Sequence, residues 1–137
     1  FHEAVLKLRQ RGIPAIIHII LGLPGETKAQ MLETVSYVGR LPVFGVKLQL
    51  LHVLSDTDLG ALYREHPFPL FTQEEYCGLV CRCLEILPPS ITIHRLTGDG
   101  PRELLMAPLW SRAKRSVLNQ IHQSLKEQDT WQGKYCR

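Results

Sequence analysis

Glycine, proline and charged side chains follow the most apolar runs of this 137-residue chain, and these residues could contribute to a site. The run Ile16–Leu21 is followed at once by the loop Gly22-Leu23-Pro24-Gly25. Two glycines allow the backbone to turn sharply or to approach a ligand closely, and the proline stiffens the bend. The loop matches neither the GxGxxG dinucleotide fingerprint nor a phosphate loop ending in Gly-Lys-Ser/Thr. By itself it is more typical of a plain turn than of a ligand site.

Polar side chains inside the apolar runs are candidates for contacting a substrate, because ligands of α/β folds bind at the carboxyl ends of the strands. Strand alternation places His18 on the same face as Ile20, which we expect to be an inner face. It also places Lys47 and Gln49 opposite the apolar set to which Val46 belongs. For His18 and Gln49, a hydrogen-bonded polar group in the core is an equally good interpretation.

A histidine, an arginine and an acid gather at the third apolar run, in the string Ile93-His94-Arg95-Leu96-Thr97-Gly98-Asp99. A His-Arg pair at a strand end, with an acid after a glycine turn, is a common way to hold an anion or a polar substrate. His94 and Arg95 have opposite parity, so only one of them can face inward. The predicted substrate pocket consists of His18, Lys47, Gln49, His94, Arg95 and Asp99.

Three of the four cysteines, Cys77, Cys81 and Cys83, have the spacing CxxxCxC inside a predicted helix. On a helix of about 3.6 residues per turn, Cys83 points about 200° away from Cys81, so three thiolates cannot converge on one cluster. We expect small buried or partly exposed thiols there. A zinc site formed with His66 or His94 stays open as an alternative, although the paired spacing typical of zinc sites is missing. No metal ligand is assigned.

The apolar periodicity predicts the element order α-β-α-β-α-β-α, which implies right-handed βαβ units and a parallel sheet. Three strands are few for a free-standing parallel sheet, whose edges need cover. Both a doubly wound sheet and a piece of a β/α barrel fit this order. The helices are expected near residues 1–10, 26–41, 72–87 and 111–128, with a short one within 56–64, and the strands at 16–21, 45–54 and 91–96.

Composition indicates an ordinary globular protein, with 45% hydrophobic residues, 21% charged residues and a net charge of +3. No apolar stretch approaches the roughly 20 residues of a membrane span. Four cysteines without a secretory signal predict cytosolic thiols. Basic residues gather from Arg112 to Arg137, which favours a solvated helix face over a nucleic-acid footprint. A chain that opens on Phe1 and not on Met is expected to be a fragment or a processed product.

Taken in order, the motifs resemble those of radical S-adenosylmethionine (SAM) enzymes. The stretch 18–27, HIILGLPGET, resembles the fifth barrel strand and its loop, where a run of the form IxGxPGET lies along the adenine of SAM. The stretch 46–54 with the following DTDL resembles the sixth strand and its loop. The stretches 93–101, 107–111 and 129–133 narrow the match to an uncharacterised bacterial radical SAM family, distantly similar to the Elongator catalytic subunit.

The resemblance implies an α/β fold that is the C-terminal part of a partial (β/α)6 barrel. Residues 1–110 would form its βα units, and residues 111–137 a C-terminal helix and tail packed on the barrel. The implied cofactors are SAM and a 4Fe-4S cluster, but the cluster-binding CxxxCxxC loop does not occur in this chain. Contacts to SAM, mostly through backbone and apolar groups, are implied for Ile20, Gly22, Leu23, Pro24, Gly25, Leu51, His52 and Val53.

A complete barrel of this family would cleave SAM reductively to methionine and a 5′-deoxyadenosyl radical, which takes a hydrogen atom from the substrate. This chain would contribute part of the SAM and substrate pocket, and by itself we expect it to be inactive. Two alternatives remain: a non-catalytic module that binds tRNA or other RNA through the basic C-terminal helix and Trp131, or an inactive truncated α/β module. We expect a cytoplasmic protein and no membrane partner.

Overall fold

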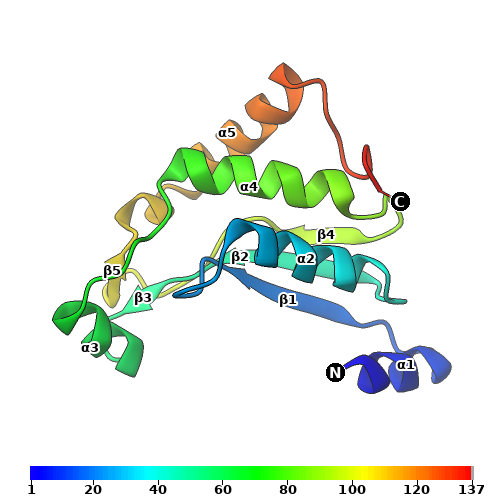
Figure 1. Cartoon of the computed structure of the whole chain (residues 1–137), viewed down its shortest axis with the longest axis horizontal. Coiled ribbons are helices and arrows are strands. Elements are labelled where there is room, and N and C mark those ends of the chain that lie inside the picture. The colour runs from blue at the N-terminus through cyan, green and yellow to red at the C-terminus, as the bar shows by residue number, and fades with distance from the viewer. Residues whose placement is uncertain (137) are drawn as a thin grey trace.

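Helices and strands alternate along most of the chain, as the apolar periodicity predicts. The computed structural model describes residues 1–136, so Arg137, counted above in the basic group, lies outside the described residues. Three strands, β1 (Ile16–Leu21), β2 (Gly45–Leu50) and β4 (Thr92–Arg95), form the main sheet. In Figure 1, α4 (Gln73–Ile86) and α5 (Lys114–Glu127) lie above the strands and α1 (His2–Gln10) lies below them.

The main sheet is parallel, with the strand order β1-β2-β4. β1 pairs with β2 in unbroken register along all 6 residues. Between β2 and β4 the register shifts after Val46, so that Lys47 stands opposite Arg95. Parallel neighbours need a crossover connection, here supplied by helices, and this confirms the predicted βαβ architecture.

One face of the sheet is buried beneath α2 (Lys28–Gly39) and α4. Leu21 of β1, Val46 of β2 and Val80 of α4 are completely inaccessible to solvent. Full burial of one such side chain contributes about 1.5–3 kcal/mol, so this layer holds the sheet and helices together. α5 packs against α4 and adds Val117 and Ile121 to the same core.

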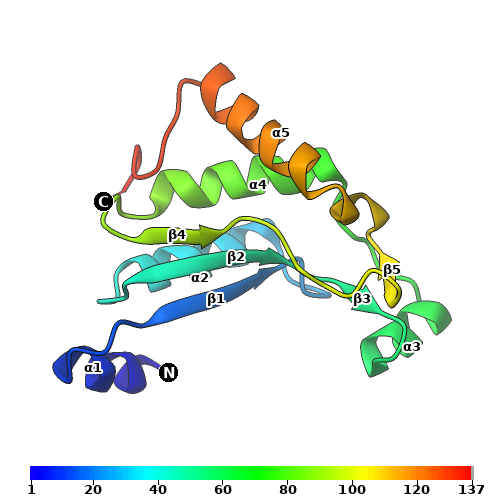
Figure 2. The ribbon, with the colours of Figure 1, turned by 180° about the vertical axis from the view of Figure 1, so that it is seen from behind.

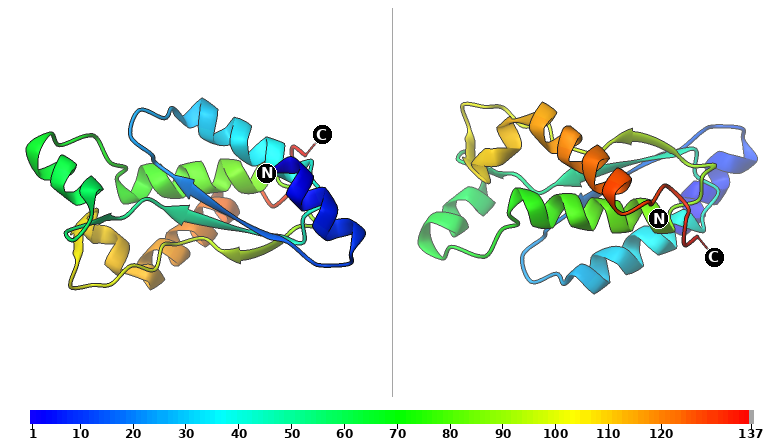
Figure 3. Two further views of the ribbon diagram at one scale, coloured as in Figure 1. Left: turned by 90° about the horizontal axis from the view of Figure 1, so that it is seen from below. Right: turned by 90° about the horizontal axis from the view of Figure 1, so that it is seen from above.

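The opposite face of the sheet is open among the described residues, apart from α1 at one end (Figure 3). Ile16 and Ile20 of β1 point to this face and are 39% and 45% exposed. His18, between them, is also exposed. Parallel sheets are normally covered on both faces. This one-sided burial fits a wall segment of a barrel, the fold that the resemblance implies.

Two helices begin with reciprocal side-chain caps. The Glu75 amide donates to the Thr72 hydroxyl, and the Thr72 amide donates to the Glu75 carboxylate, which confirms the predicted capping box of α4. Thr27 and Gln30 form the same arrangement at the start of α2. These caps fix where each helix leaves the sheet edge, because they satisfy amides that have no partner within the helix.

The predicted strand 45–54 is wrong in its second half. The main sheet ends at Leu50, and Val53–Leu54 form a separate strand, β3, which pairs antiparallel with β5 (Leu105–Ala107). β5 was not predicted from the sequence, because a strand of 2 or 3 residues is too short to show an alternating apolar pattern. Residues 51 and 52 lie between the two strands and turn the chain away from the main sheet.

Two helix boundaries also differ from expectation. The short helix expected within 56–64 is α3 (Asp58–Glu65). The last helix, predicted from residue 111, is preceded by a 3₁₀ turn, η1 (Leu109–Arg112), and α5 itself begins at Lys114. Short 3₁₀ turns are frequent at the ends of α-helices and share their local pattern, so the sequence does not separate the two.

The segment after α5 folds back along the end of α4. The Gly133 amide donates to the Leu84 carbonyl at 3.0 Å, and the Tyr135 amide donates to the Glu85 carbonyl at 2.8 Å. The Thr130 hydroxyl donates to the buried Glu85 carboxylate at 2.7 Å. These bonds hold the tail against α4. The division of the chain at residue 110 stays a prediction.

Gly45→Ala tests the crowded start of β2. A Cβ at residue 45 would lie 2.4 Å from the His94 ring and 2.8 Å from the Thr92 carbonyl oxygen, so the sheet would have to shift. We expect the free energy of unfolding of the full-length protein to fall by about 1–3 kcal/mol in urea denaturation.

Gly78→Ala is the matched control for that substitution, because a Cβ at this position in α4 meets nothing within 4 Å. Alanine is favoured over glycine inside a helix by about 1 kcal/mol, so this variant should be unchanged or slightly more stable. Equal stability of the two variants would contradict the crowding at Gly45.

Candidate functional site

The carboxyl ends of β1, β2 and β4 meet at one edge of the main sheet, where β3, β5 and α3 also gather (Figure 2). The Leu51 amide donates to the Leu21 carbonyl at 2.9 Å, which holds β1 and β2 together one residue past their ends. Ligands of parallel α/β folds bind at this edge, so we take it as the candidate site.

The loop after β1 has the conformation that its glycines permit. Gly22 and Gly25 have φ angles of 92° and 79°, in the left-handed region that disfavours a residue with a Cβ. The Phe71 ring would lie 3.2 Å from a Cβ at Gly22, so the loop packs closely on this ring. A cavity of about 420 Å³ lies between the loop and residues 68–71. Small-molecule sites usually measure roughly 300–1,000 Å³.

Two buried polar side-chain atoms at this edge, Glu26 Oε2 and His52 Nε2, have no hydrogen-bond partner within residues 1–136. An unpaired buried polar atom costs about 1–3 kcal/mol, and in native proteins water or a ligand usually satisfies it. Glu26 comes directly after the β1 loop, and His52 comes shortly after β2.

The His52 ring fits into the turn that follows β4. A Cβ at Gly98 or at Gly100 would come within 2.5 Å or 2.6 Å of the ring, so glycine at both positions makes room for it. Burial first, and the positive charge of Lys114 second, lower the pKa of His52 from its ordinary value, while Asp99 acts in the opposite direction. The neutral imidazole is therefore favoured at pH 7.

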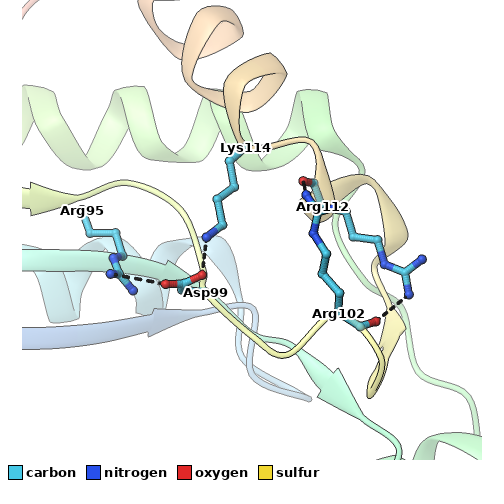
Figure 4. Close-up of polar contacts among 5 residues, drawn as sticks. All are labelled: Arg95, Asp99, Arg102, Arg112 and Lys114. Carbon is cyan, nitrogen blue, oxygen red and sulfur yellow. Dashed lines mark hydrogen bonds and ion pairs between the residues drawn. The ribbon is translucent and has the colours of Figure 1, made fainter.

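Asp99 joins two cations from different elements (Figure 4). Its carboxylate accepts a hydrogen bond from Lys114, the first residue of α5, and pairs with the Arg95 guanidinium at 3.7 Å. The hydrogen bond and the charge of Lys114 hold the pKa of Asp99 below its ordinary value. These side chains are between 35% and 51% exposed, so the pairs add little stability. Their effect is to position the end of β4 beside the start of α5.

The buried Tyr76 and the half-buried Trp110 pack behind this turn. The Tyr76 hydroxyl of α4 donates to the Leu96 carbonyl at 2.8 Å, and burial raises the pKa of Tyr76. The ring of Trp110 lies 5.7 Å from that of Tyr76, and its indole N–H donates to the Phe71 carbonyl at 2.9 Å. The stretch 107–111 that carries the resemblance includes Trp110, whereas Tyr76 was not predicted to have a role, because a lone buried aromatic leaves no periodic signal.

The predicted pocket residues of β1 and β2 share one face of the sheet. His18 stands opposite Lys47, and Ile20 stands opposite Gln49. Lys47 and Gln49 are half-buried and alternate with the buried set that contains Val46. The structure thus brings His18, Lys47 and Gln49 together on the open face, in rows that lead up to the strand ends.

His94 is not part of that group. Its ring lies over Gly45, the first residue of β2, and its centroid is 5.9 Å from that of the exposed Phe44. His94 therefore lies at the amino-terminal end of β2, opposite the end that carries the glycine loop and His52.

The bulge in β4 breaks the alternation on which the sequence argument about His94 and Arg95 depends. Ile93 and Leu96 both pack against the core, although regular alternation would direct residues three apart to opposite faces. The register shift places Arg95 opposite Lys47. A parity rule for a regular strand does not apply here, because a bulge inserts one extra residue into the strand.

The residues implied for SAM contact divide by exposure. Ile20, Leu23, Pro24 and Gly25 are exposed at the sheet edge, whereas Gly22 and His52 are half-buried. Leu51 and Val53 have buried side chains, so only their backbone groups could meet a ligand. Val53 also pairs with Ala107 of β5, which places it behind the strand end.

The three cysteines of α4 are buried, as expected. Burial raises the pKa of Cys77 to about 11 and that of Cys83 to about 12, and it also raises the pKa of Cys81. Thiols held in the protonated form are poor metal ligands. Within residues 1–136, no group of three or more His, Cys, Asp or Glu side chains could hold a metal ion.

Two arginines near the His52 turn were not predicted to be site residues. Arg112 was interpreted as part of a solvated helix face, and Arg102 was not singled out. Each donates to the other's backbone carbonyl, Arg112 at 2.9 Å and Arg102 at 3.4 Å (Figure 4). They lie 10 residues apart, and only the fold of the connecting loop brings them together.

Comparison with known proteins agrees with this arrangement. Residues 43–127 match the model of the Radical_SAM C-terminal domain. The chain belongs to this radical SAM family. It is 44% identical over 133 residues to the uncharacterized protein YtqA of Bacillus subtilis, across 97% of this chain and 41% of that protein. It is 27% identical over 130 residues to a tRNA uridine(34) acetyltransferase of Dehalococcoides mccartyi, across 90% of this chain and 28% of that protein.

The fold of this radical SAM domain is also found in a solved structure. An archaeal Elp3 from Methanocaldococcus infernus matches with a TM-score of 0.73 and 15% identity, across 91% of this chain and 29% of that one. The distant similarity to the Elongator catalytic subunit is thus confirmed at the level of the fold. The chain spans about two fifths of the length of the curated relatives that it matches most strongly.

The two cofactors of the family fit the described residues unequally. A 4Fe-4S cluster does not fit within residues 1–136, because the clustered thiols are buried in a helix and protonated. An adenosine-like ligand fits better. The strand ends offer an exposed apolar side chain at Ile20, a glycine loop, and the Glu26 Oε2 atom, which lacks a partner within residues 1–136.

Burial of the α4 thiols predicts a graded reactivity. In a short iodoacetamide pulse at pH 8 on the folded full-length protein, the exposed Cys136 should be alkylated first. Cys77 and Cys83 should stay unmodified, because a thiol with a pKa near 11 or 12 has almost no thiolate at that pH. Peptide mapping by mass spectrometry measures each site, and a denatured sample in which all four react is the control. Equal labelling of Cys77 and Cys136 would contradict the packing of α4.

Proposed function

We propose that this chain forms the adenosine side of the SAM site and part of the substrate pocket in a radical SAM enzyme. The observation that carries the proposal is the meeting of three features at the carboxyl edge of one parallel sheet. These are the glycine loop after β1, the exposed Ile20, and the buried Glu26 Oε2 atom, which has no hydrogen-bond partner within residues 1–136. Membership of the radical SAM family supports it.

In this proposal the residues of β1 and β2 bind and orient the adenosine. Ile20 offers an apolar surface to the base, and the loop Gly22-Leu23-Pro24-Gly25 lets the backbone come close to it. Leu51 and His52, which follow β2, and Val53 of β3 contribute mainly backbone groups. The buried Phe71 contact holds the loop in place.

The open face of the sheet provides the substrate wall. His18, Lys47 and Gln49 are adjacent there and can donate or accept hydrogen bonds from a polar substrate. Arg95 and Asp99 lie at the edge where SAM would bind. His94 would reach only a substrate that extends to the amino end of the strands.

SAM and the 4Fe-4S cluster, whose ligands are not in this chain, would supply the reductive cleavage chemistry of the full-length enzyme. The described residues would hold the adenosine and shield the pocket from water. Within residues 1–136, no helix is long and apolar enough to cross a membrane. Free buried thiols suit a reducing compartment, and we include a cytoplasmic location in the proposal.

A second candidate concerns the substrate class. The similarity to a tRNA uridine(34) acetyltransferase favours tRNA or another RNA as the substrate. The residues that border the candidate site include Arg95, Arg102, Arg112 and Lys114, which suits a polyanion. Binding that weakens steeply with salt concentration would support RNA, and binding that is insensitive to salt would exclude it.

Ile20→Ala tests the placement of SAM. Loss of apolar contact with the base, worth about 1 kcal/mol, should raise the dissociation constant of SAM for the reconstituted full-length protein about fivefold. Isothermal titration under anaerobic conditions measures the binding, and formation of 5′-deoxyadenosine with dithionite as the reductant measures cleavage.

Ile16→Ala is the matched control, because Ile16 lies on the same strand and face and is similarly exposed. It stands four residues nearer the amino end, about 13 Å away at roughly 3.3 Å per residue. This variant should bind SAM within about twofold of the parent protein. Equal effects of both substitutions would contradict the placement, and a reconstituted protein that neither binds nor cleaves SAM would overturn the proposed function.

A further inference from the structure

A small cavity opens beside the turn that holds the His52 ring. It lies next to the residues that follow β4, whereas the glycine loop follows β1 on the other side of β2. The cavity measures about 140 Å³, well below the roughly 300–1,000 Å³ of sites that enclose a whole small molecule. A single chemical group is therefore its natural occupant. We call it the arginine pocket, and its walls include His52, Gly98, Gly100, Arg102, Arg112 and Lys114.

The charges around the arginine pocket do not balance. Arg102, Arg112 and Lys114 line it, and Arg95 reaches its edge through Asp99. Asp99 supplies the carboxylate among the lining residues, and both Lys114 and Arg95 form an ion pair with it. Three cations therefore line the pocket beside one carboxylate. An excess of positive charge around a cavity attracts an anion.

The two arginines are held in place by backbone carbonyls and not by carboxylates. Arg112 donates to the carbonyls of Arg102 and Leu105, at 2.9 Å and 3.2 Å. Arg102 donates to the carbonyl of Arg112. Among the described residues neither forms an ion pair with a carboxylate. A guanidinium has five N–H donors in a planar fork, so each arginine keeps donors for a ligand while its backbone bonds fix its orientation.

Two further groups at the pocket lack a partner. His52 lines it, and its buried Nε2 atom has no hydrogen-bond partner within residues 1–136. α5 begins at Lys114, with Ala113 as a cap that has no side-chain hydrogen bond and with no acidic residue in the first turn. The first amides of a helix are free to bind an anion, and the helix dipole favours negative charge there.

We propose that the arginine pocket binds one phosphate group of the substrate, a proposal that rests on the proposed radical SAM function. Phosphate carries more charge than a carboxylate and accepts hydrogen bonds from several directions, which matches donors on three separate segments. These segments are the link after β2 that carries His52, the loop that carries Arg102, and the start of α5. Because the pocket holds only this group, the rest of the substrate would extend along the open face of the sheet.

Inorganic phosphate is the first probe, titrated into the full-length protein by calorimetry in a buffer free of phosphate and sulfate. The parent protein should bind it saturably. Arg112→Gln should weaken binding at least tenfold, since a charge-assisted hydrogen bond is about twice as strong as a neutral one. Arg115→Gln is the matched control, because Arg115 follows Lys114 on α5 but lines a different surface groove. It should change the affinity less than twofold.

Asp99→Asn is a second variant, and misfolding cannot produce the result that we expect from it. Removal of this carboxylate releases Lys114 from its pair and raises the positive charge of the pocket, so phosphate should bind about threefold more tightly. A damaged protein cannot produce that gain. The proposal is overturned if the parent protein does not bind phosphate, if Arg112→Gln and Arg115→Gln behave alike, or if Asp99→Asn weakens binding.

Two further probes distinguish the source of the phosphate. These are a nucleoside 5′-monophosphate and a mixed-sequence RNA 12-mer, each tested with the parent protein, Arg112→Gln and Arg115→Gln. Binding that depends on Arg112 for either probe supports the pocket and names the source. RNA binding that falls equally in both variants would indicate a general basic surface and overturn the proposal. SAM titrations of the same samples keep the two proposals separate, because phosphate binding without SAM binding defeats only the proposed function.

Discussion

Burial of one face of the parallel sheet beneath α2 and α4 is the constraint on which the rest of the structure depends. Leu21, Val46 and Val80 lose all contact with solvent in this layer. Because the apolar side chains alternate along each strand, the same packing directs His18, Lys47 and Ile20 to the other face. A layer held from one side leaves an open wall and three free strand ends, and these are the parts available to a ligand.

The strand ends depend on close packing between backbone and rings. Gly22 lies against Phe71, and His52 fits between Gly98 and Gly100. In each case the glycine makes room for a ring, and the ring in turn holds the loop that the glycine allows. Among the described residues, the buried His52 Nε2 atom has no hydrogen-bond partner.

The two proposals assign different parts of this edge to different tasks. The loop after β1 and Ile20 would hold adenosine, while the cations around Asp99 would hold an anionic group of the substrate. Lys114 acts within the second region, because its charge lowers the pKa of both His52 and Asp99. Loading of the arginine pocket with an anion would offset that charge. The arrangement fits an enzyme that must place a substrate beside SAM without letting either occupy the other's site.

Local patterns were enough to predict the alternating helices and strands, the capping box of α4, the burial of its cysteines and the radical SAM motifs, because each depends on residues close together in the chain. They failed where distant segments meet. The antiparallel β3–β5 pair, the bulge that separates His94 from Arg95, and the meeting of Arg102, Arg112 and Lys114 with His52 depend on tertiary contacts. Such contacts leave no periodic signal, since the residues involved are up to 62 positions apart, from 52 to 114. The sequence alone therefore predicted the framework and the glycine loop, and only the folded chain revealed the charged pocket beside them.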